Sequence, residues 1–529
     1  MRCIRDNNKT TVSTTTSEDV SVQILDFEKL TTECTPLILD TYQRPYVWDE
    51  DKVTQLLQDF TDFIDNDSLE SHRQYYLGTI LLHEKNEPAQ KQYCVIDGQQ
   101  RLTTLAILYW LLHDRLPKGI QFTFRSVRSL ANVQQVRNTI RNKFDEHPQL
   151  QQHFINLLKH LRFTVIRVTS EDLAFTFFDT QNNRGVPLGS TDLLKAFHLR
   201  AIHNHDEQQV KHLQSLCARK WEQVQQCGER VKQNNNYDFA PNLFHYYLWR
   251  ARNWRGSDVK ELESRDDMLN HFGEHSLPAE VGQVALFSAR ANVWGKALTL
   301  TQNNDLLLTP AIQYVSQNAL HLPFSLRQPI SRGVGFFLFT EKYAQMIQNL
   351  LFSKSSDVEI NAIQDFYRVV VSTLSAYLQS LFQLALLAYV DRLGTHGLLR
   401  FSFYLDHRLG ALRLSQADIR RETPLKFLRD AKQNLLDVIA QAYVGDEVVN
   451  FLKTDNVDKS YSQNASYQKN IDMLGSNVQE RYIKALAKYY ALTKLSDKTS
   501  NVMEMKVNLV LHSAPNSENS PRAGSLLHV

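Results

Sequence analysis

Residues 95–104 read Val-Ile-Asp-Gly-Gln-Gln-Arg-Leu-Thr-Thr, and they join an apolar run to a segment with helical periodicity. The run over 93–96, Tyr-Cys-Val-Ile, is rich in β-branched and aromatic residues and predicts a strand. Residues 99–113 repeat apolar side chains at helical spacing and predict a helix. Gly98 permits a tight turn between the two. A strand that passes through a glycine turn into a helix indicates an α/β or α+β domain.

The start of this predicted helix has the chemistry of a phosphate site. The first backbone N–H groups of a helix, here those of Gln99, Gln100 and Arg101, are unpaired and lie at the positive end of the helix dipole. An anion bound there would also meet the Arg101 guanidinium. The alternative needs no ligand, because Asp97 and Gln100 have the spacing of a capping box.

A second cluster, residues 42–49, reads Tyr-Gln-Arg-Pro-Tyr-Val-Trp-Asp and leads into a helix predicted over 50–65. Arg44 lies between aromatic residues and could bind an anion, while Tyr46 and Trp48 could stack on a planar base. Alternatively, the aromatic side chains fill the space over a sheet, and Asp49 caps the helix.

A third cluster spans residues 178–195, where Asn183-Arg184-Gly185 has the composition of a turn and Ser190 or Thr191 that of a helix N-cap. Arg184 and Lys195 could hold phosphates. A loop followed by a capped helix accounts for the same residues without a ligand.

The pattern changes once along the chain. Strands are predicted at 75–82, 93–96 and 163–168 in the first part, whereas the later periodicity is helical, over 287–320, 341–350, 361–392, 424–444 and 477–495. We therefore predict an α+β architecture, a mixed α/β domain followed by a large irregular all-α domain. The expected limits are a disordered leader at 1–20, the two domains at 21–205 and 206–495, and a flexible tail at 496–529.

Composition excludes several classes of protein. The 529 residues contain 59 Lys+Arg and 57 Asp+Glu, a net charge of +2, which argues against a uniformly basic nucleic-acid coat. The five cysteines form no C-x-x-C pair, and the P-loop, G-x-S-x-G and H-E-x-x-H motifs are missing, so we assign no metal site. The uncharged stretch 369–390 contains too many Ser, Thr and Gln residues for a membrane span. We expect a cytoplasmic protein without a membrane segment.

A local basic run offers a nucleic-acid surface. Residues 115–144 contain seven Lys/Arg and no Asp or Glu. Such a run can neutralise phosphates and would make binding salt-dependent. The alternatives are a solvated helical face or an edge strand protected by charge. The DNA-binding candidates are Arg125, Arg128, Arg137, Arg141 and Lys143.

Taken in order, the motifs Q-R-x-Y-x-W, D-G-Q-Q-R-L-T-T and F-x-x-x-N-x-R-G-x-x-L-x-x-x-D-L-L-K resemble the N-terminal module of GmrSD-type restriction proteins over residues 21–205. That module also occurs in other phage-defence nucleases, and its fold is similar to ParB and sulfiredoxin. The resemblance implies binding and hydrolysis of an NTP, GTP or ATP, with Mg²⁺ as a candidate cofactor.

By position, the resemblance implies that Asp97 orients water or a metal, Gln100 positions water or phosphate, and Arg101 stabilises developing charge. The implied nucleotide-binding residues are Gln43, Arg44, Tyr46, Trp48, Gly98, Gln99, Thr103, Asn183, Arg184 and Lys195.

The chain departs from two-module family members, which end in an HNH nuclease. Asp406-His407 is the nearest look-alike, but no histidine and asparagine follow it at suitable places. We therefore expect a sensor subunit that acts on modified or foreign DNA with a separate nuclease and can form a homo-oligomer. The alternatives are a non-catalytic switch module that binds nucleotide or DNA, and a toxin or regulator that acts on RNA.

Overall fold

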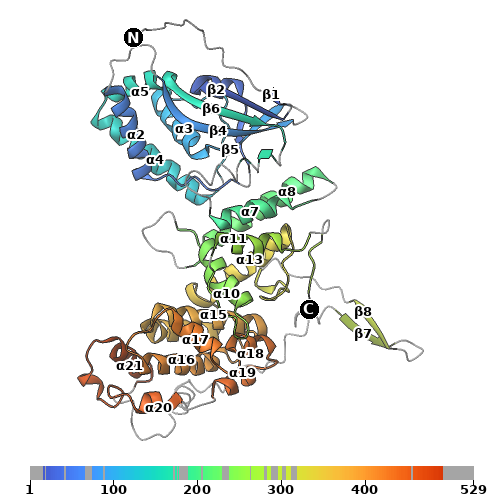
Figure 1. Cartoon of the computed structure of the whole chain (residues 1–529), viewed down its shortest axis with the longest axis vertical. Helices are drawn as coiled ribbons and strands as arrows, with labels where there is room; N and C mark the ends of the chain where they lie inside the picture. Colours follow the sequence, from blue (N-terminus) through green and yellow to red (C-terminus); the bar gives the residue numbers. More distant parts are fainter. Residues whose placement is uncertain are drawn as a thin grey trace, which may run out of the picture. The chain divides into compact units, whose positions relative to one another are not determined.

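A computed structural model gives the fold of the chain (Figure 1). It describes residues 16–17, 19–40, 43–65, 74–86, 90–124, 126–170, 173–174, 177, 189–203, 206–228, 237–262, 264–278, 283–287, 296–300, 306–310, 319–453 and 457–491. The chain divides into two compact units, one made of Met1–Glu222 with Val231–Tyr237 and the other of Gln223–Arg230 with Asp238–Val529. The domain limits expected at residues 20, 205 and 495 stay predictions.

The first unit contains a mixed six-stranded sheet with the order β1-β2-β6-β4-β5-β3. The neighbouring pairs β1–β2, β2–β6 and β4–β5 are antiparallel, whereas β4–β6 and β3–β5 are parallel. The strands are β1 (Thr16–Ser17), β2 (Val20–Asp26), β3 (Leu37–Leu39), β4 (Tyr75–Asn86), β5 (Lys91–Asp97) and β6 (Leu161–Val168).

Helices α1 to α5 pack against one face of this sheet and enclose its hydrophobic core. Helix α2 buries Val53, Leu56, Leu57 and Phe60 at helical spacing, and the figure places α2, α4 and α5 together beside the strands (Figure 1). The helices of this unit are α1 (Phe27–Glu33), α2 (Glu50–Asp65), α3 (Gln99–His113), α4 (Val127–Glu146), α5 (Gln149–His160) and α7 (Ser190–Arg200), followed by α8 (Glu207–Gln225), which ends in the second unit.

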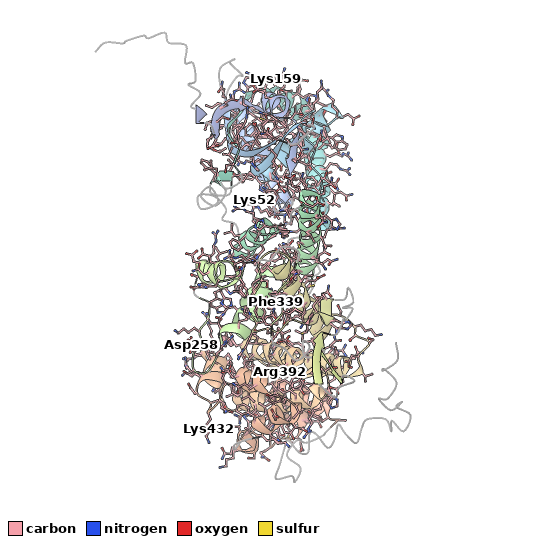
Figure 2. The ribbon with its side chains drawn as sticks, turned by 90° about the vertical axis from the view of Figure 1, so that its right-hand side faces the viewer. Lys52, Lys159, Asp258, Phe339, Arg392 and Lys432 are labelled. Atoms are coloured by element: carbon pink, nitrogen blue, oxygen red, sulfur yellow. The ribbon has the colours of Figure 1, made fainter. Side chains whose placement is uncertain are left out.

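The second unit is mostly helical, and Phe339 is one of its buried side chains (Figure 2). Three of its segments, η1, η2 and η4, are π-helical. Its elements are α9 (Ala240–Asn242), η1 (Leu243–Leu248), α10 (Trp249–Asn253), α11 (Arg265–Leu269), η2 (Asn270–Glu274), β7 (Lys296–Leu300), β8 (Leu306–Pro310), η3 (Ala319–His321), α13 (Val334–Ile347), η4 (Gln348–Phe352), α14 (Val358–Val369), η5 (Val371–Thr373), α15 (Ala376–Leu393), α16 (Leu398–Ser415), α17 (Glu422–Arg429), α18 (Leu435–Gln441), α19 (Gly445–Leu452), α20 (Val457–Ser462), η6 (Ile471–Met473) and α21 (Val478–Tyr489).

The predicted fold class is confirmed as α+β with a large helical region after the sheet. The three predicted strands occur as β4, β5 and β6, and the helices predicted at 50–65 and 99–113 occur as α2 and α3. Two residues of the expected leader, Thr16 and Ser17, form β1. The likeness to ParB and sulfiredoxin stays a prediction.

The prediction of a helix over 287–320 is wrong, because β7 and β8 lie in this range and pair as antiparallel strands. Their sequences are separated by Thr-Gln-Asn-Asn-Asp, a polar stretch typical of a hairpin connection, and β8 ends at Pro310. The long helices predicted at 361–392 and 424–444 are each divided, into α14 and α15 and into α17 and α18. Local caps at Ser375 and Asn434 start α15 and α18.

The uncharged stretch 369–390 is largely α15, whose buried side chains include Leu378, Leu381 and Phe382. Among the described residues, no helix combines the length and apolarity that crossing a bilayer requires.

The Asp406-His407 pair lies inside α16 and is buried. The Tyr482 hydroxyl donates to Asp406 Oδ2 over 3.1 Å, and the Tyr461 hydroxyl donates to the His407 carbonyl over 2.9 Å. These hydrogen bonds place the pair in the core of the helical unit rather than at an exposed nuclease centre.

The stability of the helical unit should depend on the protonation of His271. Arg252 Nε donates to His271 Nε2 over 2.9 Å, so the imidazole must be neutral in the folded chain. Burial, aided by Arg252, lowers the pKa of His271 from 6.5 to about 4. The unfolded chain therefore takes up a proton first as the pH falls. We expect the free energy of unfolding to decrease by about 2 kcal/mol between about pH 6.5 and pH 4.5.

Urea unfolding across this pH range measures the effect. His271→Gln keeps an acceptor for Arg252 but does not titrate, so its pH dependence should be flatter by that amount. Equal slopes in the two proteins would contradict the assignment.

Candidate functional site

The start of helix α3 lacks the capping box that was the alternative to a phosphate site. The N-cap is Gly98, with φ +97°, and no side chain caps the helix. Asp97 is the last residue of β5 and lies within 3.3 Å of Arg101. The capping-box interpretation of Asp97 and Gln100 is therefore wrong, because the left-handed glycine moves the cap one residue on and the Gln100 side chain turns to another segment.

Gln100 holds the segment that precedes α2. Its Oε1 accepts from the backbone N–H of Val47 over 2.8 Å and of Trp48 over 3.2 Å, and its Nε2 donates to the Pro45 carbonyl. The side chain is only 7% exposed. Gln100 thus supplies hydrogen bonds that this extended segment cannot obtain from a sheet.

Tyr46 anchors the same segment in the core. It is fully buried, its hydroxyl lies 2.7 Å from Thr104 Oγ1, and its backbone N–H and carbonyl bond to Ser129 and Asn132. Burial raises the pKa of Tyr46 well above its usual value. Tyr46 and the half-buried Trp48 pack with the core of the unit, which agrees with the alternative that these aromatics fill space beside the sheet.

Arg101 is bound to the backbone of strand β4. Its guanidinium donates to the carbonyls of Leu77 over 2.8 Å and of Thr79 over 2.7 Å. Between these carbonyls lies Gly78, where a Cβ would come within 2.3 Å of Arg101 Nη1. Burial lowers the pKa of Arg101, opposed by Asp97. The guanidinium therefore secures an irregularity in β4, where the pairing with β6 shifts register.

Gly98→Ala should destabilise the sheet-containing unit by about 1–3 kcal/mol, because an L-residue is strained at this φ. A Cβ there would also approach Ile80 Cδ1 to 2.3 Å. Urea unfolding measures the loss. Gly394→Ala is the matched control, since Gly394 also has a positive φ but open space around its Cβ. A Gly98→Ala protein no less stable than the control variant would contradict the expected contact.

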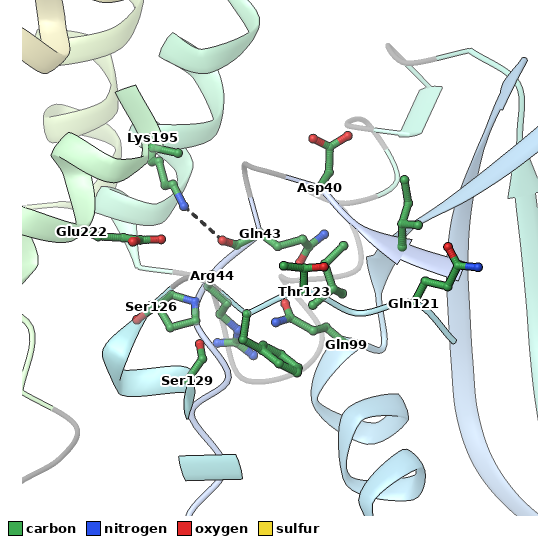
Figure 3. Close-up of a pocket in the computed structure, with 15 residues that line it drawn as sticks. Asp40, Gln43, Arg44, Gln99, Gln121, Thr123, Ser126, Ser129, Lys195 and Glu222 are labelled. Carbon is green, nitrogen blue, oxygen red and sulfur yellow. Dashed lines mark hydrogen bonds between the residues drawn. The ribbon is translucent and has the colours of Figure 1, made fainter. Parts of the chain in front are cut away.

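A polar cavity of about 220 Å³ lies beside Gln99, at the carboxyl ends of the parallel strands β3 and β5 (Figure 3). Its walls come from the end of β3, residues 43–45, the start of α3, the segment before α4 with the first turn of α4, and helices α7 and α8. The lining residues are Ile38, Leu39, Asp40, Gln43, Arg44, Pro45, Gln99, Gln121, Thr123, Phe124, Ser126, Ser129, Lys195, Ala218 and Glu222.

Three side chains set the polar character of this cavity. The Arg44 guanidinium forms no hydrogen bond or ion pair with the described residues. Lys195 is 4% exposed, and its Nζ donates to the Gln43 carbonyl over 3.1 Å. Gln99 is 6% exposed, and its Oε1 has no hydrogen-bond partner in the described structure. Two cations and a buried, unsatisfied acceptor favour a ligand with both an anionic group and hydrogen-bond donors.

Both cations act on a partly buried carboxyl group, that of Asp192. Burial raises the pKa of Asp192, and the positive charges of Arg44, Lys195 and Arg128 oppose this increase. Asp192 lies in the first turn of α7, whose N-cap is Gly189 rather than the expected Ser190 or Thr191. The Asp192 carboxyl thus interacts electrostatically with Arg44 and Lys195.

The structure brings some of the predicted residues together and separates others. Gln43, Arg44, Gln99 and Lys195 line the cavity. The residues assigned elsewhere in the unit are Asp97, Gly98, Gln100, Arg101, Thr103, Tyr46 and Trp48, none of which lines it. Asn183 and Arg184 lie outside the described residues. No described group of three His, Cys, Asp or Glu residues is placed to hold a metal.

The sequence interpretation missed six polar lining residues, namely Asp40, Gln121, Thr123, Ser126, Ser129 and Glu222. They lie outside the three recognised motifs, and four of them are polar neutral residues without a distinctive spacing. Asp40 also accepts a hydrogen bond from Lys85, which links it to β4. Only the folded arrangement brings these positions to one cavity.

The basic run does not form one uniform surface. Arg141 is exposed and Lys143 half-exposed on α4, whereas the Arg137 guanidinium lies over the Trp110 ring at 5.9 Å and Arg128 acts on Asp192. Arg125 lies outside the described residues. Of the four candidates that the structure describes, Arg141 and Lys143 are therefore the most exposed to solvent.

A mixed sheet, a strand–glycine–helix start and a polar cavity at strand ends characterise this α+β domain. The family model described as the N-terminal domain of GmrSD restriction endonuclease matches residues 23–199. These residues form a GmrSD-type N-terminal domain. Residues 213–469 match a second model, described as a family of unknown function (DUF7834). No curated protein matches the chain.

Proposed function

We propose that this chain is the nucleotide-binding and nucleotide-hydrolysing sensor of a GmrSD-like restriction system directed at modified or foreign DNA. The name of the matching domain supplies the restriction context. The observation that supports nucleotide binding is a polar cavity in which the Arg44 guanidinium and Gln99 Oε1, beside Lys195, have no hydrogen-bond partner among the described residues.

In this proposal, the charged cavity residues bind the phosphates of an NTP, and an uncharged residue forms a hydrogen bond with the rest of the nucleotide. The Arg44 guanidinium and the Lys195 ammonium would bind phosphate oxygens. Gln99 Oε1 would accept from an N–H or O–H of the nucleotide, which removes the cost of leaving it buried without a partner. An accompanying Mg²⁺ needs only one or two carboxylates besides the phosphates, and Asp40 and Glu222 line the cavity.

The second candidate is a switch that binds nucleotide without hydrolysing it. It is favoured by the hydrogen bonds of Gln100 and Arg101, which are directed to backbone groups of the 45–48 segment and β4. Those bonds would have to rearrange before either side chain could act on a phosphate. Asp97, with a carboxylate 35% exposed, is the proposed catalytic residue that keeps most freedom.

One experiment separates the two candidates. Titration calorimetry with ATP, GTP, CTP and UTP, with Mg²⁺, measures binding, and phosphate release measures turnover with plain and modified DNA. Hydrolysis predicts phosphate release that Asp97→Asn abolishes while nucleotide binding persists. Saturable binding without release assigns the switch, and an absence of binding to every nucleotide rejects both. Adding a partner nuclease tests whether nucleotide controls DNA cleavage.

We further propose that α4 contacts DNA phosphates through Arg141 and Lys143. The double variant Arg141→Gln/Lys143→Gln should weaken DNA binding several-fold and lower the slope of log K against log salt by about 2, one for each lost phosphate contact. Fluorescence anisotropy over a salt series measures both quantities. Lys29→Gln/Lys159→Gln removes the same charge from exposed positions on α1 and α5 and should leave the slope unchanged. Equal slopes in all three proteins would refute the contact.

A further inference from the structure

The helical unit contains a cavity of its own, about 220 Å³ in volume. Helices α10, α15 and α18 and the chain over 325–327 form its walls. The lining residues are Ala251, Ser325, Leu326, Arg327, Ala388, Asp391, Arg392, Leu436 and Ala440. All of them fall within the segment that matches the family of unknown function.

One wall of this cavity is held rigidly by buried charges. Asp391 accepts from the Leu326 backbone N–H over 2.9 Å and from the Tyr343 hydroxyl over 2.7 Å, and it pairs with Lys342. Arg252 donates to the carbonyls of Leu326 and Gln328. A chain segment whose backbone is fixed in this way resists collapse into the adjacent space, so the cavity is preformed.

The positive charges that line this cavity are not all paired with carboxylates of the described residues. Arg327 is committed to Asp437 and to two backbone carbonyls, and Asp391 is committed to Lys342. Arg392 donates only its Nε, to the Ala442 carbonyl, and lies 5.7 Å from the Tyr443 ring centre. Within the described structure, its two terminal nitrogens have no hydrogen-bond partner. Among the residues that the structure describes, Arg392 therefore has no carboxylate partner.

The rest of the lining indicates which kind of ligand the cavity could hold beside Arg392. The Ser325 hydroxyl has no hydrogen-bond partner among the residues that the structure describes, whereas the walls contributed by α10, α15 and α18 include apolar side chains. Those apolar residues are Ala251, Ala388, Leu436 and Ala440. A planar guanidinium binds a carboxylate through two parallel hydrogen bonds. We propose that this cavity binds a small organic carboxylate, with its carboxylate on Arg392 and Ser325 and its compact apolar body against these walls.

Benzoate is a suitable probe, because it combines one carboxylate with a compact apolar ring. Titration calorimetry of the full chain at constant ionic strength should give saturable binding of benzoate at one site. Arg392→Gln should weaken it at least tenfold, and Ser325→Ala by several-fold. Arg400→Gln is the matched control, because Arg400 also belongs to the helical unit but pairs with Asp446 away from this cavity.

A cavity-filling variant tests the site without removing charge. Ala440→Leu should abolish benzoate binding while Arg392 stays in place, and circular dichroism establishes that the variant is folded; Ala388→Leu replaces it if it is not. Absence of saturable benzoate binding to the unaltered chain would overturn the proposal, as would equal binding by Arg392→Gln. Inorganic phosphate that displaces benzoate with equal or higher affinity would overturn the assignment to carboxylates.

Discussion

Replacing Gln100 with alanine is expected to lower the free energy of unfolding of the sheet-containing unit by about 2–4 kcal/mol. The variant leaves the backbone N–H groups of Val47 and Trp48 without their acceptor and the Pro45 carbonyl without its donor. An unsatisfied buried polar group costs about 1–3 kcal/mol, and water can reach part of this segment, so the total stays below the simple sum. Urea unfolding followed by tryptophan fluorescence measures the change.

The neighbouring Gln99 provides the control for this prediction. Gln99→Ala removes a side chain of the same type and similar burial, but the Gln99 Oε1 has no hydrogen-bond partner to lose in the described structure. We expect it to cost less than 1 kcal/mol, since it also relieves an unsatisfied acceptor. If both variants lose the same stability, the interpretation that the hydrogen bonds of Gln100 stabilise residues 45–48 is wrong.

Arg44→Gln is expected to weaken NTP binding about 10–100-fold with little change in stability. Hydrogen bonds to charged groups contribute about 1.5–3 kcal/mol, which corresponds to this range of affinity. The fold should tolerate the change, because the guanidinium forms no hydrogen bond with the described part of the chain, and Lys195 and Arg128 still act on the Asp192 carboxyl. Calorimetry with the best-binding nucleotide measures the affinity, and urea unfolding of the same protein measures the stability.

Arg115→Gln is the matched control for Arg44→Gln, because Arg115 is exposed and does not line the cavity. Affinity should be unchanged in this variant. If Arg44→Gln binds nucleotide as tightly as the control, the nucleotide lies elsewhere. The two main variants are also distinguishable from each other, since Gln100→Ala should lose stability and Arg44→Gln should lose affinity alone.

Local sequence patterns predicted several elements of the sheet-containing unit. The apolar alternation of β6 and the helical spacing of α2 and α3 are short-range signals that a single chain reveals. The pattern failed over 287–320, where leucine-rich runs suit either a strand or a helix. It also missed the seven-residue strand β2 and the three-residue strand β3. Short apolar runs do not distinguish these structures without knowledge of their neighbours.

The amino-acid sequence by itself determined the strand–glycine–helix start at 95–104 and the resemblance to GmrSD-type proteins, because both depend on residues close together in the chain. Only the tertiary structure decided how the polar side chains of that motif are used. Gln100 and Arg101 bond to backbone groups 53 and 24 residues away, at Val47 and Leu77, whereas Gln99 lines the cavity with Arg44 and Lys195. The three adjacent polar residues therefore differ in use: two bond to distant parts of the chain, and one faces the cavity. Their partners are far apart in the sequence, so only folding decides which residue does which.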